Sequence, residues 1–414
     1  MVEFYRETEF KEETGIGRIP KDWRIVRFKN ILKEVDLRGK DIGDAEKLPV
    51  LSLTKDFGLI PQEQRFHKRV AADDTSNYKV VKRGWLVYNP YVIWEGAICV
   101  LRDIEMGLVS PVYPVWEPTA DVDYHFLHYL IRTKRMLSTF FRLATGVVQR
   151  RRSLKKKDFL EILIPLPPLE EQKLIARILY SMDEAIRAVD DSIAKWERLK
   201  KGLMQELLTK GIGHKEFKEE AGIGRIPASW KAARLIDVAD YINGYPFSTK
   251  DWKDHGLPII RIQNLNDPDA EFNYFDGDID SKYIVNDGDI LFSWSGSIGV
   301  YLWNRGKAVL NQHIFKVIPR QGVDRIYLYY ALHMAVEQLK RRVHGSTMKH
   351  FRRGELKTTY IPLPPLEEQK RIAKILSSVD AVIEEKRRKK ARLERMKKAL
   401  MNLLLTGKIR VRSD

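Results

Sequence analysis

The chain contains two pairs of internal repeats, and any fold must accommodate both. Phe10–Arg27, FKEETGIGRIPKDWRIVR, recurs at Phe217–Arg234 as FKEEAGIGRIPASWKAAR, with 12 of 18 positions identical. Ile164–Ala176, IPLPPLEEQKLIA, recurs at Ile361–Ala373 with 12 of 13 positions identical. Even residue usage gives about one chance match in twenty positions, and a repeated sequence is the signature of a repeated structural unit. The chain is therefore predicted to contain two copies of one arrangement.

The repeats alternate along the chain, and this order predicts the domains. The first repeated sequence recurs after 207 residues and the second, the proline-rich landmark, after 197. The first module is therefore 10 residues longer than the second between these two sequences. Arg83–Asn89 still corresponds to Asp287–Ser293, each reading as a buried strand, but most of the modules has diverged. The two modules share their flanking sequences but differ in the sequence between them. This pattern suggests that each module performs the same task on a different target. The predicted segments are a globular module over 1–166, a long helix over 167–212, a second module over 213–363 and a second long helix over 364–414.

Each proline-rich landmark leads into a helical pattern. Glu170 and Glu171 follow two prolines, in a first turn where carboxylates complement the helix dipole. Apolar residues then recur at spacings of mostly three and four, a heptad-like seam. Lys386 and Lys390 interrupt this seam in the second helix, which predicts a looser or wetter middle. The seam of the first helix consists of Ile175, Leu179, Met182, Ile186, Val189, Ile193, Trp196, Leu199, Leu203 and Leu207.

The two helices are predicted to pack against each other. A long helix with an exposed apolar stripe is not stable alone, so each is the other's natural mate. A pseudo-two-fold relation between the halves would make the pair antiparallel, with one module at each end of a rod. The first helix continues into the second module, and the second helix ends with residues that match that continuation. We therefore expect the two chain termini to lie close together.

Composition narrows the class of partner. Lys and Arg number 73 against 56 Asp and Glu, a net charge of +17, which favours a polyanion such as nucleic acid. The one cysteine, Cys99, excludes a disulfide framework and fits a reducing compartment. No apolar run approaches the ~18 residues of a membrane span, and the N-terminus resembles no signal peptide. The expected location is the cytoplasm, with no membrane partner.

Several motifs that suggest chemistry are better explained by structure. Gly15-Ile16-Gly17 lacks the third glycine of a dinucleotide loop and has no strand-like run before it, so it predicts a turn. Asn89-Pro90-Tyr91 resembles a truncated adenine-binding motif of amino-group methyltransferases, but a loop bend is the better interpretation. His125 and His128 lack the further ligands of a metal site and are predicted to pack within a helix. Catalysis by this chain alone is not expected.

Basic residues gather at matching places in the two modules, just ahead of each proline-rich landmark. Such clusters neutralise phosphates and give sequence-independent affinity for DNA. A solvated charged face is the alternative interpretation, and guanidinium groups could also read guanine edges. The predicted DNA-binding residues are Arg150, Arg151, Arg152, Lys155 and Lys156 in the first module and Arg341, Arg342, Lys349, His350, Arg352 and Arg353 in the second.

Together these features resemble the specificity subunit of Type I restriction-modification systems. The resemblance rests on the doubled IPLPPLEEQ landmark with its long helix and on the IGRIP entry to each module. It extends to GLVSPVY at Gly107–Tyr113, GDILFSWSG at Gly288–Gly296 and NQHIFKVIP at Asn311–Pro319. It covers nearly the whole chain, and the doubled landmark is its most specific element.

The resemblance implies both a fold and a function. In that family two globular α/β target recognition domains alternate with two conserved helices that pair as an antiparallel coiled coil. Each domain reads one half of an asymmetric, bipartite sequence in double-stranded DNA. The subunit has no chemistry and no cofactor of its own. Two modification subunits carry S-adenosylmethionine and methylate adenines, and restriction subunits, which use ATP and Mg²⁺, complete the nuclease.

Two other functions remain compatible with the residues alone. One is a stand-alone sequence-specific DNA-binding protein, which would bind tightly without partners. The other is an RNA-binding or tRNA-handling protein, for which the same positive charge is suitable. Competition between duplex DNA and structured RNA would separate these two alternatives.

Overall fold

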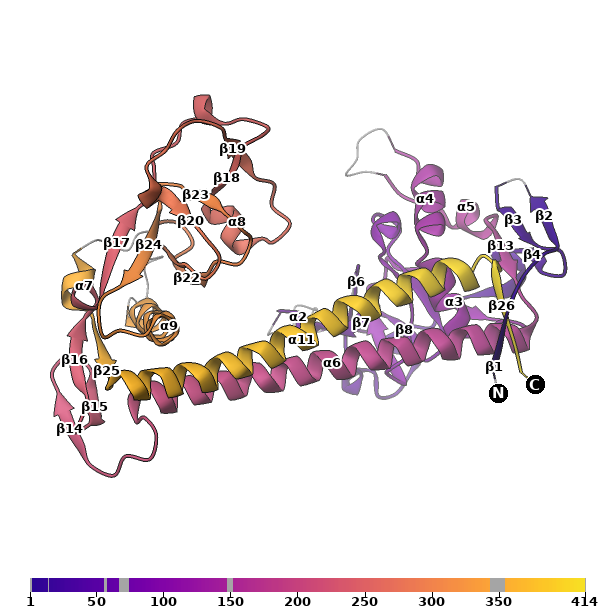
Figure 1. Ribbon diagram of the computed structural model, residues 1–414. Coiled ribbons are helices and arrows are strands. Elements are labelled where there is room, and N and C mark those ends of the chain that lie inside the picture. The colour runs from indigo at the N-terminus through magenta and orange to yellow at the C-terminus, as the bar shows by residue number, and fades with distance from the viewer. Residues whose placement is uncertain are drawn as a thin grey trace. The chain divides into compact units, whose positions relative to one another are not determined.

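A computed structural model describes residues 2–13, 15–55, 58–66, 74–146, 152–342 and 354–413. Their contacts divide the chain into two compact units. Unit 1 comprises Met1–Asp190 and Lys389–Asp414, and unit 2 comprises Asp191–Arg388. Figure 1 shows two long helices, α6 (Leu169–Thr209) and α11 (Leu366–Leu404). Each of them contributes one part to unit 1 and one part to unit 2.

Unit 1 contains the first module, and both ends of the chain belong to it. Its remaining elements are β1 (Val2–Arg6), β2 (Phe10–Glu13), β3 (Gly17–Pro20), β4 (Arg24–Arg27), α1 (Phe28–Ile31), β5 (Leu32–Val35), β6 (Leu51–Thr54), β7 (Gly58–Pro61), α2 (Gln62–Phe66), β8 (Lys79–Lys82), β9 (Leu86–Tyr88), β10 (Ile98–Val100), β11 (Met106–Val109), β12 (Val115–Pro118), α3 (Tyr124–Ile131), α4 (Lys134–Leu143), α5 (Lys156–Leu160), β13 (Leu163–Leu166) and β26 (Ile409–Ser413).

A four-stranded antiparallel sheet with the order β10-β9-β12-β5 is the centre of unit 1. All three residues of β9 are buried, as its apolar run predicts, and α3 packs against β10. The core beneath the sheet includes Trp23, Trp116 and Phe126. Leu179 of α6 and Leu404 of α11 enter the same core, so both helices are integral to this unit.

Unit 2 is one continuous stretch of chain. Its remaining elements are β14 (Phe217–Glu220), β15 (Gly224–Pro227), β16 (Lys231–Arg234), α7 (Leu235–Val238), β17 (Ala239–Asn243), β18 (Leu257–Ile260), α8 (Ile262–Asn266), β19 (Asn273–Phe275), β20 (Ile284–Val285), β21 (Ile290–Ser293), β22 (Gly299–Leu302), β23 (Ala308–Leu310), β24 (Ile314–Pro319), α9 (Arg325–Arg342), α10 (Glu355–Thr358) and β25 (Tyr360–Leu363).

Two four-stranded sheets lie in unit 2, with the orders β17-β24-β21-β22 and β19-β18-β23-β20, beside the two-stranded sheets β14-β15 and β16-β25. All strand pairs in them are antiparallel except β18 with β23. β21, which corresponds to β9 of unit 1, is buried throughout, as predicted. Trp230, Tyr327 of α9 and Leu376 of α11 share the core of this unit. The α/β class of the modules is therefore confirmed.

The helix pair is antiparallel within each unit, as predicted. In unit 1, Asp183 pairs with Lys397 at 2.5 Å, and Asp190, further along α6, pairs with Lys390, which lies earlier in α11, at 2.7 Å. Unit 2 repeats this order with Glu197–Arg387 and Lys200–Asp380, both at 2.7 Å. Lys390 interrupts the apolar seam of α11, and its ion pair with Asp190 explains how a charged residue is accommodated there.

The two ends of the chain lie side by side in unit 1. β1 and β26 pair in an antiparallel ribbon, with Val2 opposite Ser413 and Arg6 opposite Ile409. The expectation that the termini are neighbours is confirmed (Figure 1).

The glycine pair Gly15 and Gly17 lies in the turn between β2 and β3, at φ values of 83° and 77°. Gly222 and Gly224 occupy the same turn between β14 and β15, at 85° and 88°. The left-handed backbone favours glycine at each position. The prediction of a turn rather than a phosphate loop is confirmed. No helix within the described residues is long and apolar enough to cross a membrane.

Candidate functional site

The first predicted basic cluster lies on a segment anchored at both ends. Thr145 and Ser153 exchange backbone hydrogen bonds of 3.1 and 3.0 Å. Arg150 and Arg151 lie between them, outside the described residues. The Leu154 N–H donates to the Pro90 carbonyl at 3.0 Å, which joins this segment to the loop that follows β9.

Arg152 makes intramolecular contacts. Its Nη2 donates to the carbonyl oxygens of Phe141 and Ala144 at 3.3 and 3.0 Å, and its guanidinium lies 4.5 Å from the centroid of the Phe141 ring. These contacts hold the end of α4. If Arg152 also contacts DNA, its guanidinium must do so while it keeps these hydrogen bonds or after it gives them up.

The two lysines of this cluster lie at the start of α5. Lys155 is exposed, and Lys156 forms an ion pair with Glu34. Exposed ion pairs are weak, so Lys156 can exchange this partner for a phosphate. The nearby loop exposes Tyr91, whose N–H donates to Asn89 Oδ1 at 3.0 Å. The Asn89-Pro90-Tyr91 motif is thus a bend, as predicted, and it exposes an aromatic ring, a kind of surface on which nucleic-acid bases can stack.

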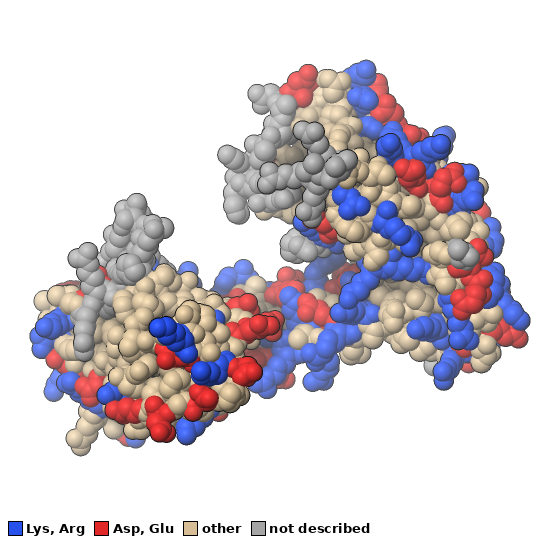
Figure 2. Space-filling view, turned by 90° about the horizontal axis from the view of Figure 1, so that it is seen from above, with Lys and Arg blue, Asp and Glu red and all other residues tan. Residues whose placement is uncertain are grey.

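The second basic cluster falls almost entirely outside the described residues. Arg341 and Arg342 end α9, but their side chains are not described. Lys349, His350, Arg352 and Arg353 also lie outside the described residues. On the face shown in Figure 2, basic side chains are interspersed with acidic ones. The DNA-contact role of both clusters stays a prediction.

The two histidines of α3 differ in burial. His128 is buried, with its Nδ1 3.9 Å from Cys99 Sγ and its ring edge-on to Tyr129. His125 is half-buried against Tyr124. The described residues contain no group of three potential metal ligands.

The clearest repeated site is the junction between each module and the helices. Trp23 Nε1 donates to Glu171 Oε2 at 3.2 Å, and Trp230 Nε1 donates to Glu368 Oε2 at 3.0 Å. All four residues are buried. Both tryptophans belong to the first repeated sequence and both glutamates to the second. The two repeated sequences therefore contact each other in the same way in both units.

The glutamine of each EEQ landmark completes this junction. Gln172 donates through Nε2 to the Pro167 and Asp121 carbonyls at 2.9 and 3.2 Å and accepts from the Asp123 N–H at 3.0 Å. Gln369 makes the equivalent contacts in unit 2, with the Pro364 and Gly322 carbonyls and the Asp324 N–H. The side-chain amide of each glutamine therefore forms hydrogen bonds with backbone groups at the start of its own long helix and with backbone groups just before α3 in unit 1 or α9 in unit 2.

A tyrosine and an aspartate attach each module further along the helices. Tyr129 donates to Asp183 at 2.6 Å, and Lys397 binds the other oxygen of that carboxylate. Tyr330 donates to Asp380 at 2.7 Å in unit 2, where Lys200 takes the place of Lys397. Sequence reasoning missed these contacts because neither tyrosine lies in a recognised repeat.

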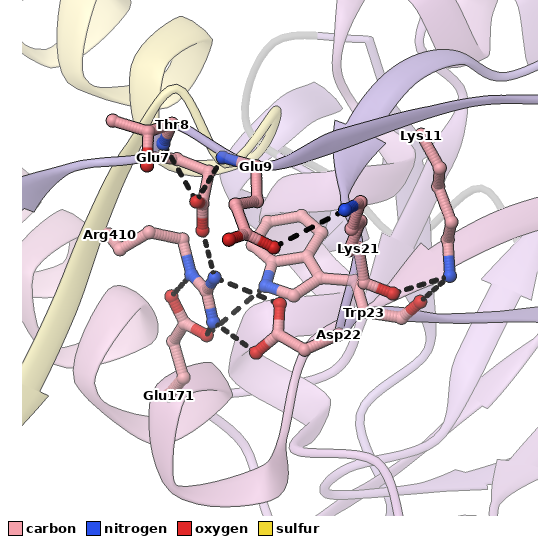
Figure 3. A network of polar contacts seen from close by, with 9 residues as sticks. All are labelled: Glu7, Thr8, Glu9, Lys11, Lys21, Asp22, Trp23, Glu171 and Arg410. Atoms are coloured by element: carbon pink, nitrogen blue, oxygen red, sulfur yellow. Dashed lines mark hydrogen bonds and ion pairs between the residues drawn. The ribbon is translucent and has the colours of Figure 1, made fainter.

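Arg410 reinforces the junction of unit 1 (Figure 3). It donates through Nε and Nη2 to Glu171 at 2.6 and 2.7 Å, through Nη1 to Glu7 at 2.5 Å, and through both terminal nitrogens to Asp22 at 2.8 and 3.0 Å. Burial lowers the pKa of Arg410, but the hydrogen bonds to Glu171 and Asp22 raise it by more. The guanidinium therefore stays charged and joins β26 to the start of α6.

Unit 2 uses a histidine at the corresponding place. His214 Nε2 lies 2.8 Å from Glu368 Oε1, which also accepts from the Ile212 N–H at 3.1 Å. Burial raises the pKa of Glu368, but the hydrogen bonds from Ile212, His214 and Trp230 lower it by more, so the pKa lies below its ordinary value of 4.5. The carboxylate is therefore the form that unit 2 stabilises.

This pKa shift predicts a pH dependence. Ionised Glu368 stabilises unit 2 above the ordinary value of 4.5, and the contribution disappears as the pH falls through the lower folded-state pKa. Glu368→Gln should reduce the stability of unit 2 at pH 7 and flatten its acid dependence. The urea midpoint of unit 2, followed by hydrogen exchange between pH 7 and 3, measures this. Glu367→Gln, at an exposed neighbour, is the control, and equal curves for both variants would contradict the assignment.

The sequence of this chain is similar to those of known proteins. The family model described as Type I restriction modification DNA specificity domain matches residues 113–195 and 227–395. The Type I restriction enzyme MjaVIII specificity subunit of Methanocaldococcus jannaschii is 30% identical over an alignment of 438 positions, which covers 100% of this chain and 99% of the relative.

Solved structures share the fold at lower identity. The Type I restriction-modification S subunit of M. genitalium aligns at a TM-score of 0.58 with 12% identity, over 95% of this chain and 97% of that chain. A chain from a structural study of complex assembly in the type I R-M system aligns at 0.54 with 21% identity, over 94% and 99% of the two chains.

Proposed function

Because this chain belongs to the family of Type I restriction-modification DNA specificity subunits, we propose that it selects the DNA sequence on which partner subunits act. Two recognition domains, one per unit, each read one half of a bipartite, asymmetric target. The observation that carries the proposal is the contrast between the two halves of the chain. Their junctions with the helices use the same Trp–Glu and glutamine contacts, whereas the sequences of the modules away from these junctions differ.

This contrast has a physical explanation. Half-sites at a fixed spacing require a fixed separation between the modules that read them. Each unit attaches to the paired helices by equivalent contacts, and we propose that the helices set the spacing of the half-sites while the differing residues of the two modules select their sequences. The family assignment favours this function over a stand-alone DNA-binding protein.

The chemistry is assigned to partners. We propose that two modification subunits, which carry S-adenosylmethionine, bind this chain and methylate adenines at its target. Restriction subunits that use ATP and Mg²⁺ join them for cleavage, and the assembly works in the cytoplasm. The chain itself contributes binding and orientation and is not an enzyme.

Mapping methylated adenines tests this function. DNA from cells that express this chain with its modification subunit should carry methyl groups in a two-part motif with a fixed gap. Cells that lack only this chain should lose that motif. If an active modification subunit produces the same methylation pattern without this chain, the proposal fails.

A second prediction concerns the gap between half-sites. Four residues inserted at opposed positions in α6 and α11 lengthen the helix pair by about 6 Å. We expect the unread gap to grow by about two base pairs, at 3.4 Å each, while both half-sites stay unchanged. The methylation map of the variant reads this directly. Altered half-sites with an unchanged gap would contradict a scaffold that sets the spacing.

A third prediction concerns the basic cluster. Lys155→Ala should weaken DNA binding to a similar degree for target and non-target duplexes and reduce the salt slope by about 1, because a phosphate contact is lost. Fluorescence anisotropy at several salt concentrations measures both effects. Lys47→Ala removes an exposed lysine that pairs with Asp44 and serves as the control. If the salt slope of DNA binding is unchanged in Lys155→Ala, this lysine does not contact DNA.

A further inference from the structure

Unit 1 contains a cavity that the junction contacts do not explain. Its volume is about 400 Å³, a size typical of small-molecule sites. It lies between the start of α3, the first turns of α6 and the segments that follow β8 and β10. Its lining consists of Arg83, Arg102, Asp123, Tyr124, His125, Lys173, Ala176, Arg177 and Tyr180.

One face of α6 provides a wall of the cavity. Lys173, Ala176, Arg177 and Tyr180 are spaced by three and four residues and therefore share a helix face. Ala176 is buried and small, which leaves space between the longer side chains. Tyr180 is exposed, so its ring remains accessible to a ligand.

The aromatic part of the lining includes a polar atom without a partner. His125 Nδ1 is buried and forms no hydrogen bond within the described part of the chain. Its ring lies 4.1 Å from that of Tyr124 at an interplanar angle of 32° and 5.9 Å from that of Tyr180 at 63°. Burial lowers the pKa of His125 by more than nearby Asp123 raises it, and Arg102 and Arg83 lower it further. A neutral imidazole can hydrogen-bond a ligand through its unpartnered nitrogen.

The cationic part of the lining can accommodate an anion. Arg177 forms no ion pair or hydrogen bond within the described part of the chain. Arg83 and Lys173 pair with Glu105 and Glu170 at the surface, and such exposed pairs are weak enough to exchange for a bound anion.

The other two charged groups in the lining are already committed. Arg102 is held by a 3.2 Å hydrogen bond to Tyr129, and Asp123 caps α3 by accepting from the Phe126 N–H at 2.8 Å. The acidic group of the cavity is therefore engaged by the helix, and the exchangeable groups are basic.

The internal repeat shows that this lining is specific to unit 1. At the corresponding positions of unit 2, Arg83 becomes Asp287 and His125 becomes Ile326. Tyr180 becomes Ser377, and Arg177 becomes Lys374. Both copies conserve the docking contacts of the helices, so docking does not require the aromatic and guanidinium groups of this cavity.

We propose that this cavity binds a nucleoside phosphate. The base stacks on the exposed ring of Tyr180, and the His125 imidazole, which lies edge-on to that ring, bonds a polar edge of the base through Nδ1. The phosphate is bound by Arg177, with Lys173 and Arg83 as further cations. The shared chemistry, a planar base linked to a phosphate, can come from a free nucleotide or from a nucleotide of bound DNA.

Calorimetric titration of the full chain with AMP, adenosine and inorganic phosphate tests this proposal. We expect saturable binding of one AMP per chain and much weaker binding of adenosine or phosphate alone. Loss of the charged hydrogen bond in Arg177→Ala should weaken AMP binding by about tenfold or more. Tyr180→Ser, which introduces the residue of unit 2, should also weaken it by removing a stacking surface.

Unit 2 supplies matched controls. Lys374→Ala and Ser377→Ala change the corresponding helix positions and should leave AMP affinity unchanged. Absence of AMP binding at millimolar concentration, or equal losses for Arg177→Ala and Lys374→Ala, would overturn the proposal. Displacement of AMP by a duplex would identify the ligand as a nucleotide of bound DNA, and binding of AMP alongside a duplex would identify a free nucleotide.

Discussion

Arg410→Met should destabilise unit 1 by about 3–5 kcal/mol, the usual effect of removing one partner of a buried ion pair. Glu171, whose side chain is 6% exposed, would lose both of its hydrogen bonds from the guanidinium. Glu7 and Asp22 would lose the same counter-charge. Methionine conserves much of the volume, so the effect measures charge rather than a cavity.

Hydrogen exchange read by mass spectrometry is the suitable measurement, because a chain with two units need not unfold in a single two-state transition. Exchange should accelerate in unit 1 and stay unchanged in unit 2. Arg412→Met is the matched control, since Arg412 lies two residues away in the same strand and pairs with the exposed Glu3. Equal changes in the two variants would show that the buried network does not stabilise unit 1.

A chain that ends after Arg388 should lose the fold of unit 1 and keep that of unit 2. The truncation removes Leu404, Leu405 and Val411, all buried in the core of unit 1. Burial of each such side chain contributes about 1.5–3 kcal/mol, and the sum for all three is comparable to the 5–15 kcal/mol that stabilises a whole domain. The truncation also removes Arg410. Amides in Met1–Asp190 should then exchange at rates close to those of an unfolded chain.

The same truncation provides its own control, because every residue of unit 2 is still present. Protection in unit 2 should therefore remain. Addition of a peptide that comprises Lys389–Asp414 should restore protection in unit 1. If unit 1 is protected in the truncated chain without the peptide, the second helix is not required for its fold.

The repeated sequences predicted the large features of the fold because they coincide with repeated contacts. The EEQ landmark supplies a buried glutamate and a buried glutamine at the start of each long helix, where Trp23 and Trp230 meet them. The same amphipathic period predicted both helices, and their pairing followed from the need to cover the apolar seams. Residues that make the same structural contact in both halves of the chain can be recognised from a single sequence, because they appear as repeats.

The remaining contacts were not predictable for a physical reason. Arg410 meets Glu7, Asp22 and Glu171, which are brought together only by tertiary folding. No local spacing marks such a network. The sequence showed the basic residues as clusters. It did not show that Arg152 donates hydrogen bonds to backbone carbonyl groups at the end of α4. The cavity beside α6 was also hidden, because His125 and Tyr180 belong to different elements.

The division of unit 1 between the two ends of the chain affects the order in which the units can fold during synthesis. Unit 2 is complete once Arg388 has been added, whereas unit 1 waits for the residues from Lys389 onward. At translation rates of about 5–20 residues per second, the interval from Asp190 to the end of the chain is roughly 10–45 s. During this time the apolar face of the first helix in unit 1 has no partner from α11. The nascent first module is therefore the part of the protein most exposed to chaperones, proteases and aggregation.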